Sequence, residues 1–379
     1  MSDRLRHLPT VAGWVVAIAL LLIAPLYADA FWLSAGLVAV AAAVGAVGLT
    51  LLVGAAGQLS FAHAFFLAVG AYAYAYFSGR PGAATTAGLG APPVLGALGA
   101  VAVAGALGLA FSPVASRLRG IYLGVASLSL VFVGQHLLQN LTSVTGGFNG
   151  RPTPAFTVAG FDFTGTDPAL TVAGVPFGAV ERLWYLGLVA LAGACLIARN
   201  LLRGRAGRAW RMIRDSEVAA AVMGVDVRRG KASAFVLSSM FAGAAGVLSA
   251  LALDRVVPDY FGLLLSIEFL AMIVIGGLGS VGGAVTGALF VTMLPIVLAR
   301  YSGVLPLVAD SGSGGVDAAV LARFCYGAAV VLVILVQPDG LAGLGRRLHD
   351  RLHPAHRTTS QPALPGSDVP RTGVFQETT

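Results

Sequence analysis

The sequence has few charged residues and few cysteines. Only 11% of its 379 residues are charged, and 57% are hydrophobic, whereas soluble domains have roughly 25% charged residues. A water-soluble fold of this length cannot bury so much apolar surface, so lipid must cover part of it. The only two cysteines, Cys195 and Cys325, both fall within apolar segments. They are interpreted as small core residues rather than as a disulfide or a metal pair.

Motifs for nucleotide hydrolysis and nucleic-acid binding are also missing. No segment matches the Gly-x-x-x-x-Gly-Lys-Ser/Thr phosphate loop, and the glycine-rich stretch 311–315 has no lysine. The net charge of +7 is not arranged as a basic stripe interleaved with aromatic residues, which an RNA-binding surface requires. The sequence therefore predicts no nucleic-acid partner, and any ATP hydrolysis must come from a separate chain.

A membrane-spanning helix needs about 20 apolar residues, and ten apolar segments, the shortest of 13 residues and the longest of 23, are the predicted spans. They are residues 11–28, 31–53, 59–77, 94–114, 121–138, 183–198, 232–253, 263–275, 283–299 and 320–336. The chain is therefore predicted to be an all-α polytopic membrane protein with about ten transmembrane helices, one more or fewer being allowed. Residues 1–344 form the predicted membrane domain. The polar tail 345–379, rich in Pro, Ser and Thr, is predicted to be a disordered cytoplasmic extension.

The distribution of Lys and Arg predicts the orientation in the membrane. Segment 199–231 contains nine basic and three acidic residues and should be cytoplasmic. The arginines near the N-terminus, after the fourth span and after the tenth span fall on the same side if both termini are cytoplasmic. The loop 140–182 then lies outside. Residues 28–30 also resemble a signal-peptide cleavage site, but the preceding apolar run is long for a signal peptide and cleavage would disrupt this charge pattern.

The cytoplasmic segment contains a short predicted helix that crosses no membrane. Asp215 is a favourable N-cap, Glu217 lies in the first turn, and Gly224 suits a C-terminal stop. A helix fixed between two spans is a natural docking element for a soluble partner. The alternative is an interfacial loop that neutralises anionic lipid.

Five segments, in order, resemble one family of transporters. The loop contains Gly-Arg at 207–208, Arg-x-x-Glu at 214–217, Ala-Ala at 219–220 and then Gly224. It resembles the coupling motif of ABC importer permeases, and specifically the LivM-type branched-chain amino acid permeases. The other four segments are residues 57–64, 117–122, 141–150 and 266–280.

The resemblance implies a permease subunit of an ATP-driven ABC importer in the bacterial inner membrane, for branched-chain amino acids or similar small polar solutes. It implies as partners a homologous LivH-type permease, two ABC ATPase subunits and a periplasmic substrate-binding protein. ATP and Mg would then bind to the ATPases, with no cofactor on this chain. The ATPase-coupling residues implied by the motif are Arg208, Arg214, Asp215, Glu217, Ala219, Ala220 and Gly224.

Three polar residues, Gln58, Ser60 and His63, lie at the start of the predicted third span. Such residues normally face a bundle interior or a water-filled path. Their i, i+2, i+5 spacing does not place them on one helical face. The segment is therefore predicted to be partly unwound, with Gly57 as the helix breaker. Its side chains either line a translocation pathway or form hydrogen bonds to neighbouring helices.

Other candidate pathway residues occur in the outer loop and near the eighth span. They are Thr145, Gly146, Gly147, Asn149, Glu268, Gly276, Gly277 and Gly279. The first four form a tight turn, which is a gate, a docking surface or a plain connection. Glu268 either attracts a substrate ammonium group or, as the favoured interpretation, pairs with a cation such as Arg255. The last three glycines permit close helix packing or a moving gate.

Two other classes of function fit the sequence less well than an importer subunit does. An ion-coupled secondary transporter or channel usually needs titratable groups deep in the membrane, and only His63 lies deep in a span. A membrane enzyme needs a nucleophile, a metal set or paired carboxylates. The spans contain no His-x-x-x-His, Glu-x-x-His or acid pair, so no catalytic residue and no metal site are predicted.

Overall fold

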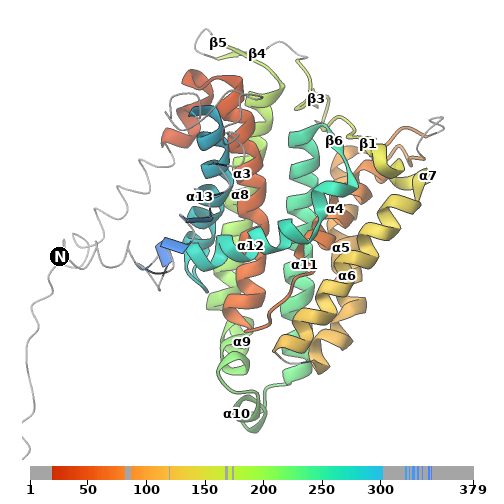
Figure 1. The fold of residues 1–379 in the computed structure, drawn as a ribbon. Coiled ribbons are helices and arrows are strands. Elements are labelled where there is room, and N and C mark those ends of the chain that lie inside the picture. Colours follow the sequence, from red (N-terminus) through yellow and green to blue (C-terminus); the bar gives the residue numbers. More distant parts are fainter. Residues whose placement is uncertain are drawn as a thin grey trace, which may run out of the picture.

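The computed structural model describes residues 19–81, 87–118, 120–166, 170–172 and 175–301, with isolated positions between 321 and 343. These residues form a bundle of helices (Figure 1). Residues 19–27, in the second half of the predicted first span, are helical. The first half of that span, most of the tenth span, Cys325 and the tail 345–379 lie outside the described residues.

Six helices of the described chain are long and apolar enough to cross a membrane. They are α3 (Ala30–Leu49) with its π-helical continuation η1 (Thr50–Ala55), α5 (Pro93–Arg117), α6 (Ile121–Asn140), α8 (Ala179–Arg203), α11 (Val227–Leu253) and α13 (Val281–Tyr301). Each contains or nearly contains a predicted span. The polytopic helical class is therefore confirmed, and the count of ten spans stays a prediction.

Two predicted spans correspond to shorter helices. They are α4 (His63–Phe77) and α12 (Leu263–Gly276). At 1.5 Å per residue, α4 is about 22 Å long and α12 about 21 Å long, so neither alone crosses a hydrocarbon core of about 30 Å. In Figure 1, α12 lies across the middle of the bundle.

The centre of the bundle is formed by α3, α4 and α11. The apolar window of α3 and η1 is 83% buried and that of α11 is 61% buried, whereas the windows of α5, α6, α8 and α13 are at most 28% buried. Small residues allow the central helices to approach closely. A Cβ atom added at Gly70 would overlap the backbone of Gly243 on α11, and one at Gly246 would overlap the carbonyl of Leu67 on α4.

The outer helices expose large apolar side chains. Leu98 on α5, Val125 on α6 and Val189 on α8 are 63%, 60% and 71% exposed. Side chains of this kind on the outside of a bundle are expected where lipid replaces water as the solvent. The peripheral helices therefore present the membrane-facing surface that the composition requires.

The chain between η1 and α4 is unwound, as the sequence predicted. Residues 57–60 are not helical and Gly57 has a φ of +68°. Backbone amides at and just before the start of α4 donate to hydroxyl groups of other helices. The amide of Phe61 donates to Ser127 Oγ at 2.8 Å, and the amide of Ala64 donates to Ser266 Oγ at 3.0 Å. Because these hydroxyls cap the helix, α4 begins four residues later than the predicted third span.

The two long connecting segments lie at opposite ends of the bundle (Figure 1). One end has α7 (Thr142–Thr145), η2 (Gly147–Asn149), η3 (Pro258–Phe261) and three antiparallel strand pairs. The pairs are β1 (Arg151–Pro152) with β6 (Arg255–Val256), β2 (Thr157–Val158) with β3 (Phe161–Asp162), and β4 (Leu170–Val172) with β5 (Val175–Phe177). The other end has α9 (Arg205–Asp215) and α10 (Glu217–Val222). This arrangement agrees with the prediction that segments 140–182 and 199–231 face opposite sides of the membrane.

Candidate coupling site

Helix α9 is anchored to the end of the bundle by its apolar face. Trp210 and Ile213 are 1% and 2% exposed, and Trp210 Nε1 donates a hydrogen bond to Ser233 Oγ on α11 at 3.1 Å. Both neighbouring spans extend into the segment predicted as a loop, since α8 continues to Arg203 and α11 begins at Val227. The chain between α8 and α11 is therefore a compact pair of helices rather than a long loop.

The N-cap of α10 is Ser216, so the prediction of Asp215 was wrong by one residue. Ser216 has an extended backbone, and its hydroxyl accepts a hydrogen bond from the amide of Ala219 at 3.2 Å. Asp215 is instead the last residue of α9, where its carboxylate pairs with Arg214 at 3.0 Å. The predicted stop is confirmed, because Gly224 follows α10 with a φ of +82°.

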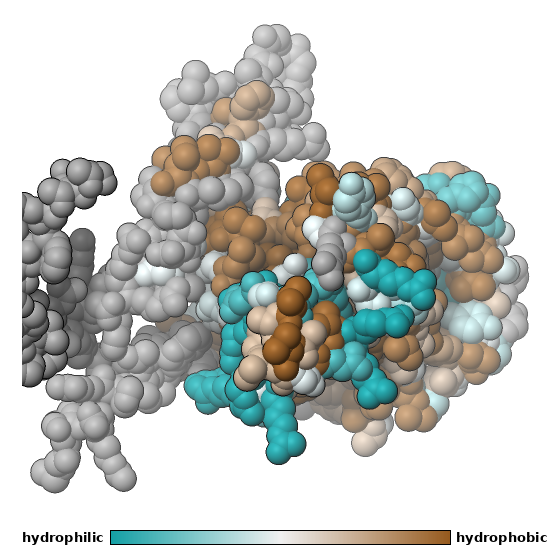
Figure 2. Space-filling view, turned by 90° about the horizontal axis from the view of Figure 1, so that it is seen from below, coloured by the Kyte–Doolittle hydropathy of each residue, from teal (hydrophilic) through white to brown (hydrophobic). Residues whose placement is uncertain are grey.

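Helix α10 points apolar side chains away from the protein. Val218, Val222 and Met223 are 72%, 82% and 72% exposed. Their i, i+4, i+5 spacing groups them on one side of the helix. Figure 2 shows this end of the molecule, where a small apolar patch is surrounded by hydrophilic side chains. An apolar patch with a polar rim is typical of a protein-docking site.

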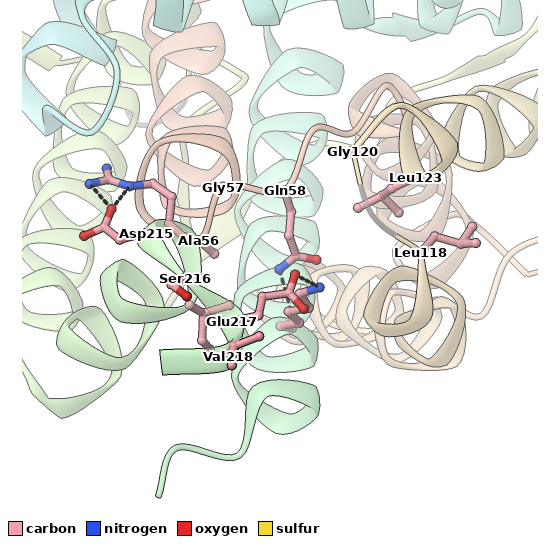
Figure 3. A pocket seen from close by; sticks show the side chains of 13 residues that line it. Ala56, Gly57, Gln58, Leu118, Gly120, Leu123, Asp215, Ser216, Glu217 and Val218 are labelled. Atoms are coloured by element: carbon pink, nitrogen blue, oxygen red, sulfur yellow. Dashed lines mark hydrogen bonds and ion pairs between the residues drawn. The ribbon is translucent and has the colours of Figure 1, made fainter. Parts of the chain in front are cut away.

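Polar contacts connect these helices to the chain around Gly57, and the Gln58 and Glu217 side chains that take part are drawn in Figure 3. The ammonium group of Lys231 on α11 pairs with the Glu217 carboxylate at 2.5 Å, and the carbonyl of Lys231 accepts a hydrogen bond from Gln58 Nε2 at 3.1 Å. Arg214 Nη1 donates to the carbonyl of Gly54 at 2.8 Å. Lys231 and Gln58 are both only 4% exposed. Helix α9 is thus linked to the chain before Gly57, and α10 is linked through Lys231 to the chain after it.

A cavity of about 290 Å³ lies between α9, α10, the unwound segment and the start of α6. Gln58, Leu123 and Glu217 are among its lining residues, and Figure 3 shows their side chains around it. Gln58 Oε1 has no hydrogen-bond partner within the described residues. A Cβ atom at Gly57 would meet the Arg214 side chain at 2.7 Å. The left-handed backbone and this close approach both favour glycine at position 57.

The other residues of the predicted coupling motif are placed on different sides of the helices. Ala220 is fully buried, whereas Ala219 is exposed. Arg208 is exposed, and its Nη1 donates to the carbonyl of Arg203 at 3.2 Å. The motif thus combines residues that hold α10 in place with residues that face outward.

The three polar residues of the predicted third span do not share one cavity. Gln58 lines the cavity next to α10. Ser60 Oγ accepts a hydrogen bond from the amide of Ala62 at 3.3 Å and stabilises the local turn. His63 is buried at the start of α4, where its ring packs edge-on against Phe269 of α12 with 4.7 Å between centroids. The structure therefore brings segments 57–64 and 266–280 together through His63.

The outer turn is held by a network of hydrogen bonds. Thr145 Oγ1 donates to the carbonyl of Leu138 at 2.6 Å and accepts from the amide of Gly147 at 3.1 Å. Gly146 joins α7 to η2. Arg151 Nη1 donates to the carbonyl of Val144 at 2.6 Å, and burial lowers the pKa of its guanidinium. These hydrogen bonds hold the turn in a defined conformation at the end of the bundle opposite α10.

The suggested pairing of Glu268 with Arg255 is absent from the structure. Arg255 Nη1 donates instead to the carbonyl of Asn149 at 2.7 Å, because the β1–β6 pairing places Arg255 beside the outer turn. Glu268 is half-buried, and its carboxylate has no hydrogen bond or ion pair with any described residue.

The glycine-rich bend between α12 and α13 is tightly packed. A Cβ atom at Gly276 would overlap the carbonyl of Gly283, and one at Gly54 would overlap the backbone of Gly279. Gly277 lies at the end of α12. The close approach explains why small residues occur here, and it places the bend directly against η1.

Lys231 is the functional candidate that the sequence analysis missed. It was counted only as one of the basic residues that orient the loop. A signal was nevertheless present, because Lys231 is the only lysine in a sequence with 24 basic residues. Lysine concentrates its charge on one ammonium group, which suits the narrow contact with Glu217 better than a planar guanidinium does.

A mainly helical bundle with apolar outer helices, an unwound inner segment and an exposed short helix fits a membrane transport subunit. The chain belongs to the family described as branched-chain amino acid transport system / permease component, whose match covers residues 32–334. This family consists of transport permeases rather than enzymes.

Three relatives illustrate the similarity. The chain is 33% identical over 304 residues to the high-affinity branched-chain amino acid transport system permease protein LivM of Escherichia coli K12, covering 76% of this chain and 70% of that protein. It is 35% identical over 244 residues to LivM of Salmonella typhimurium, covering 62% and 56%. It is 26% identical over 235 residues to the LivH permease of Escherichia coli K12, covering 62% and 68%. No solved structure matches the chain.

Proposed function

We propose that this chain translocates branched-chain amino acids or similar small polar solutes as one permease subunit of an ABC importer in the bacterial inner membrane. Family membership supports the transport role, and the similarity to LivM proteins supports the substrate class. Residues 1–344 would form the permease domain, with ten spans and both termini cytoplasmic, and 345–379 a cytoplasmic tail. The basic residues at the α9 and α10 end support this orientation.

The proposed partners are a LivH-type permease, two ABC ATPases and a periplasmic substrate-binding protein. The similarity of this chain to LivH proteins themselves supports pairing between two homologous permeases. ATP and Mg would bind to the ATPases. The binding protein would dock near the outer turn that contains Thr145, Gly147 and Asn149, at the end opposite α10.

The contact between Glu217 and Lys231 is the observation that most supports coupling to an ATPase. In this proposal the ATPase binds the exposed apolar side of α10, formed by Val218, Val222 and Met223. Arg208, Arg214, Asp215, Ala219, Ala220 and Gly224 shape or flank this docking helix. Since breaking one side of a buried ion pair costs about 3–5 kcal/mol, Lys231 moves with Glu217 rather than separating from it.

The unwound segment is the proposed moving part. When α9 and α10 are displaced together, α10 acts through Lys231 on Gln58 and α9 acts through Arg214 on Gly54, so the chain on both sides of Gly57 shifts. Ser60 and His63 follow in the same segment, Gly279 adjoins η1, and Gly276 packs against Gly283 in the same bend. A path for substrate would open or close where these segments meet α12 and Glu268.

Purification from the native membrane with mass spectrometry tests the proposal. We expect the chain to be recovered with an ATPase that has a phosphate loop and with a second permease. The recovered complex, given its binding protein, should import radiolabelled leucine into liposomes only when ATP is supplied. If the chain alone moves solute without ATP, it is an ion-coupled carrier or channel and the proposal is wrong.

A further inference from the structure

A continuous apolar stripe on α8 faces away from the protein. Val189 and Leu196 are 71% and 61% exposed, and a Cβ atom at Gly193 would meet nothing within 4 Å. These residues recur at i, i+4 and i+7 and therefore share one face of the helix. Only 17% of the apolar window of α8 is buried. Within the described chain this face has no covering element, as expected of a surface that contacts acyl chains.

The same face ends in arginines. Arg199 and Arg203 follow Leu196 at i+3 and i+7 and are both exposed. Arg211 of α9 joins them, because its Nη1 donates to the carbonyl of Leu202 at 3.1 Å. The guanidinium of Arg211 therefore lies at the C-terminal end of α8, where cations are favoured by the helix dipole.

The three arginines have no acidic partner among the residues that the structure describes. The ion pairs at this end of the bundle use Arg214, Arg229 and Lys231 instead. A guanidinium has five N–H donors, so Arg211 retains donors after its single hydrogen bond to Leu202. The cluster is thus a concentration of positive charge with unused donors, placed beside an apolar face.

The position of the cluster matches the depth of a lipid headgroup. Arg182, near the other end of α8, is buried and donates to the carbonyl of Asp162 in the outer loop. From Arg182 to Arg203 the helix rises about 32 Å at 1.5 Å per residue, close to the hydrocarbon thickness of about 30 Å. Helix α10 lies farther from the middle of the bundle than the end of α8 does (Figure 1).

We propose that Arg199, Arg203 and Arg211 bind the phosphate of an anionic phospholipid whose acyl chains lie along Val189 and Leu196. Guanidinium groups bind phosphate oxygens in a bidentate geometry. The apolar stripe that leads into the cluster favours a lipid over a free phosphate ion, and the charge favours an anionic headgroup over a zwitterionic one. The site is separate from the apolar docking side of α10 and goes beyond the transport function.

Native mass spectrometry of the purified complex tests this site. The complex, in a neutral detergent, is mixed with equal amounts of phosphatidylglycerol and phosphatidylcholine, and the retained lipid is measured. We expect the wild type to retain mainly phosphatidylglycerol, less so as the salt concentration rises. Equal retention of the two lipids by the wild type would overturn the proposal, and this comparison needs no variant.

A paired substitution locates the site. Each arginine near a membrane surface contributes roughly a fivefold gain in anionic-lipid binding, so Arg203→Gln with Arg211→Gln should weaken phosphatidylglycerol retention by about 30-fold. The matched control, Arg228→Gln with Arg229→Gln, removes the same charge from exposed positions at the start of α11 and should change retention little. Equal losses in the two double variants would show a general charge effect and contradict the assignment.

A thermal-shift measurement distinguishes a lipid from a free ion. We expect phosphatidylglycerol, but not millimolar inorganic phosphate, to raise the melting temperature of the wild type. If inorganic phosphate stabilises the complex equally well, the cluster is a phosphate site and not a lipid site. Because these readouts measure lipid binding, they remain informative even if the proposed substrate or ATPase coupling is wrong.

Discussion

Replacing Lys231 and Glu217 in turn should show that their contact links α10 to the membrane helices. Glu217→Ala leaves the ammonium of Lys231 unpaired in a site where the residue is only 4% exposed, so we expect a loss of about 3–5 kcal/mol of stability. Lys231→Met keeps the apolar stem and leaves a carboxylate whose side chain is 24% exposed. That carboxylate can turn toward water, so we expect a smaller loss of about 1–2 kcal/mol.

The double variant provides the decisive comparison. With both charged groups absent, no buried charge lacks a partner, and the combined loss should be smaller than the sum of the single losses by about 1–3 kcal/mol. Thermal unfolding of the purified complex measures all three stabilities. Arg228→Met, an exposed substitution three residues before Lys231, serves as the matched control and should stay within about 0.5 kcal/mol of the wild type.

The same variants should separate ATP hydrolysis from import. In liposomes containing the complete complex, Lys231→Met should retain ATP hydrolysis while leucine uptake falls at least tenfold, because α10 can dock but loses the ion pair that joins it to α11 and Gln58. Additive stability losses would refute the assigned ion-pair energetics. Full uptake by Lys231→Met with a normally assembled complex would refute the coupling role.

Three further substitutions test other parts of the structure. In thermal unfolding, Gly57→Ala should lower the free energy of unfolding by about 1–3 kcal/mol, because alanine disfavours the left-handed backbone there. The control Gly193→Ala, whose Cβ meets nothing within 4 Å, should leave the free energy of unfolding unchanged. Equal losses of stability in the two variants would contradict this reasoning. Val222→Asp should reduce ATPase co-purification about tenfold by placing a charge in the docking patch, whereas Val158→Asp at the opposite end should not. Glu268→Gln should leave leucine uptake within about twofold, since no described residue bonds to that carboxylate, and complete loss of uptake with normal assembly would instead indicate contact with substrate.

The sequence by itself determined the class of protein and the approximate membrane segments. Lipid burial is a local property, because each stretch of about 20 residues must be apolar on its own to cross the core. For this reason all six long described helices were anticipated within a few residues. The unwinding at Gly57 was predictable for a related reason, since three polar residues could not share one face of a continuous helix.

Only the tertiary structure decided which polar groups meet. The Glu217–Lys231 pair joins separate helices, and Arg255 bonds to Asn149 rather than Glu268 because the β1–β6 pairing brings them together. The N-cap at Ser216 depended on where α9 ends, because α9 includes Asp215 and the next helix therefore starts one residue later than predicted. Hydrogen bonds and ion pairs form over about 3 Å, so they depend on packing between distant segments, whereas membrane insertion depends on the composition of each segment alone.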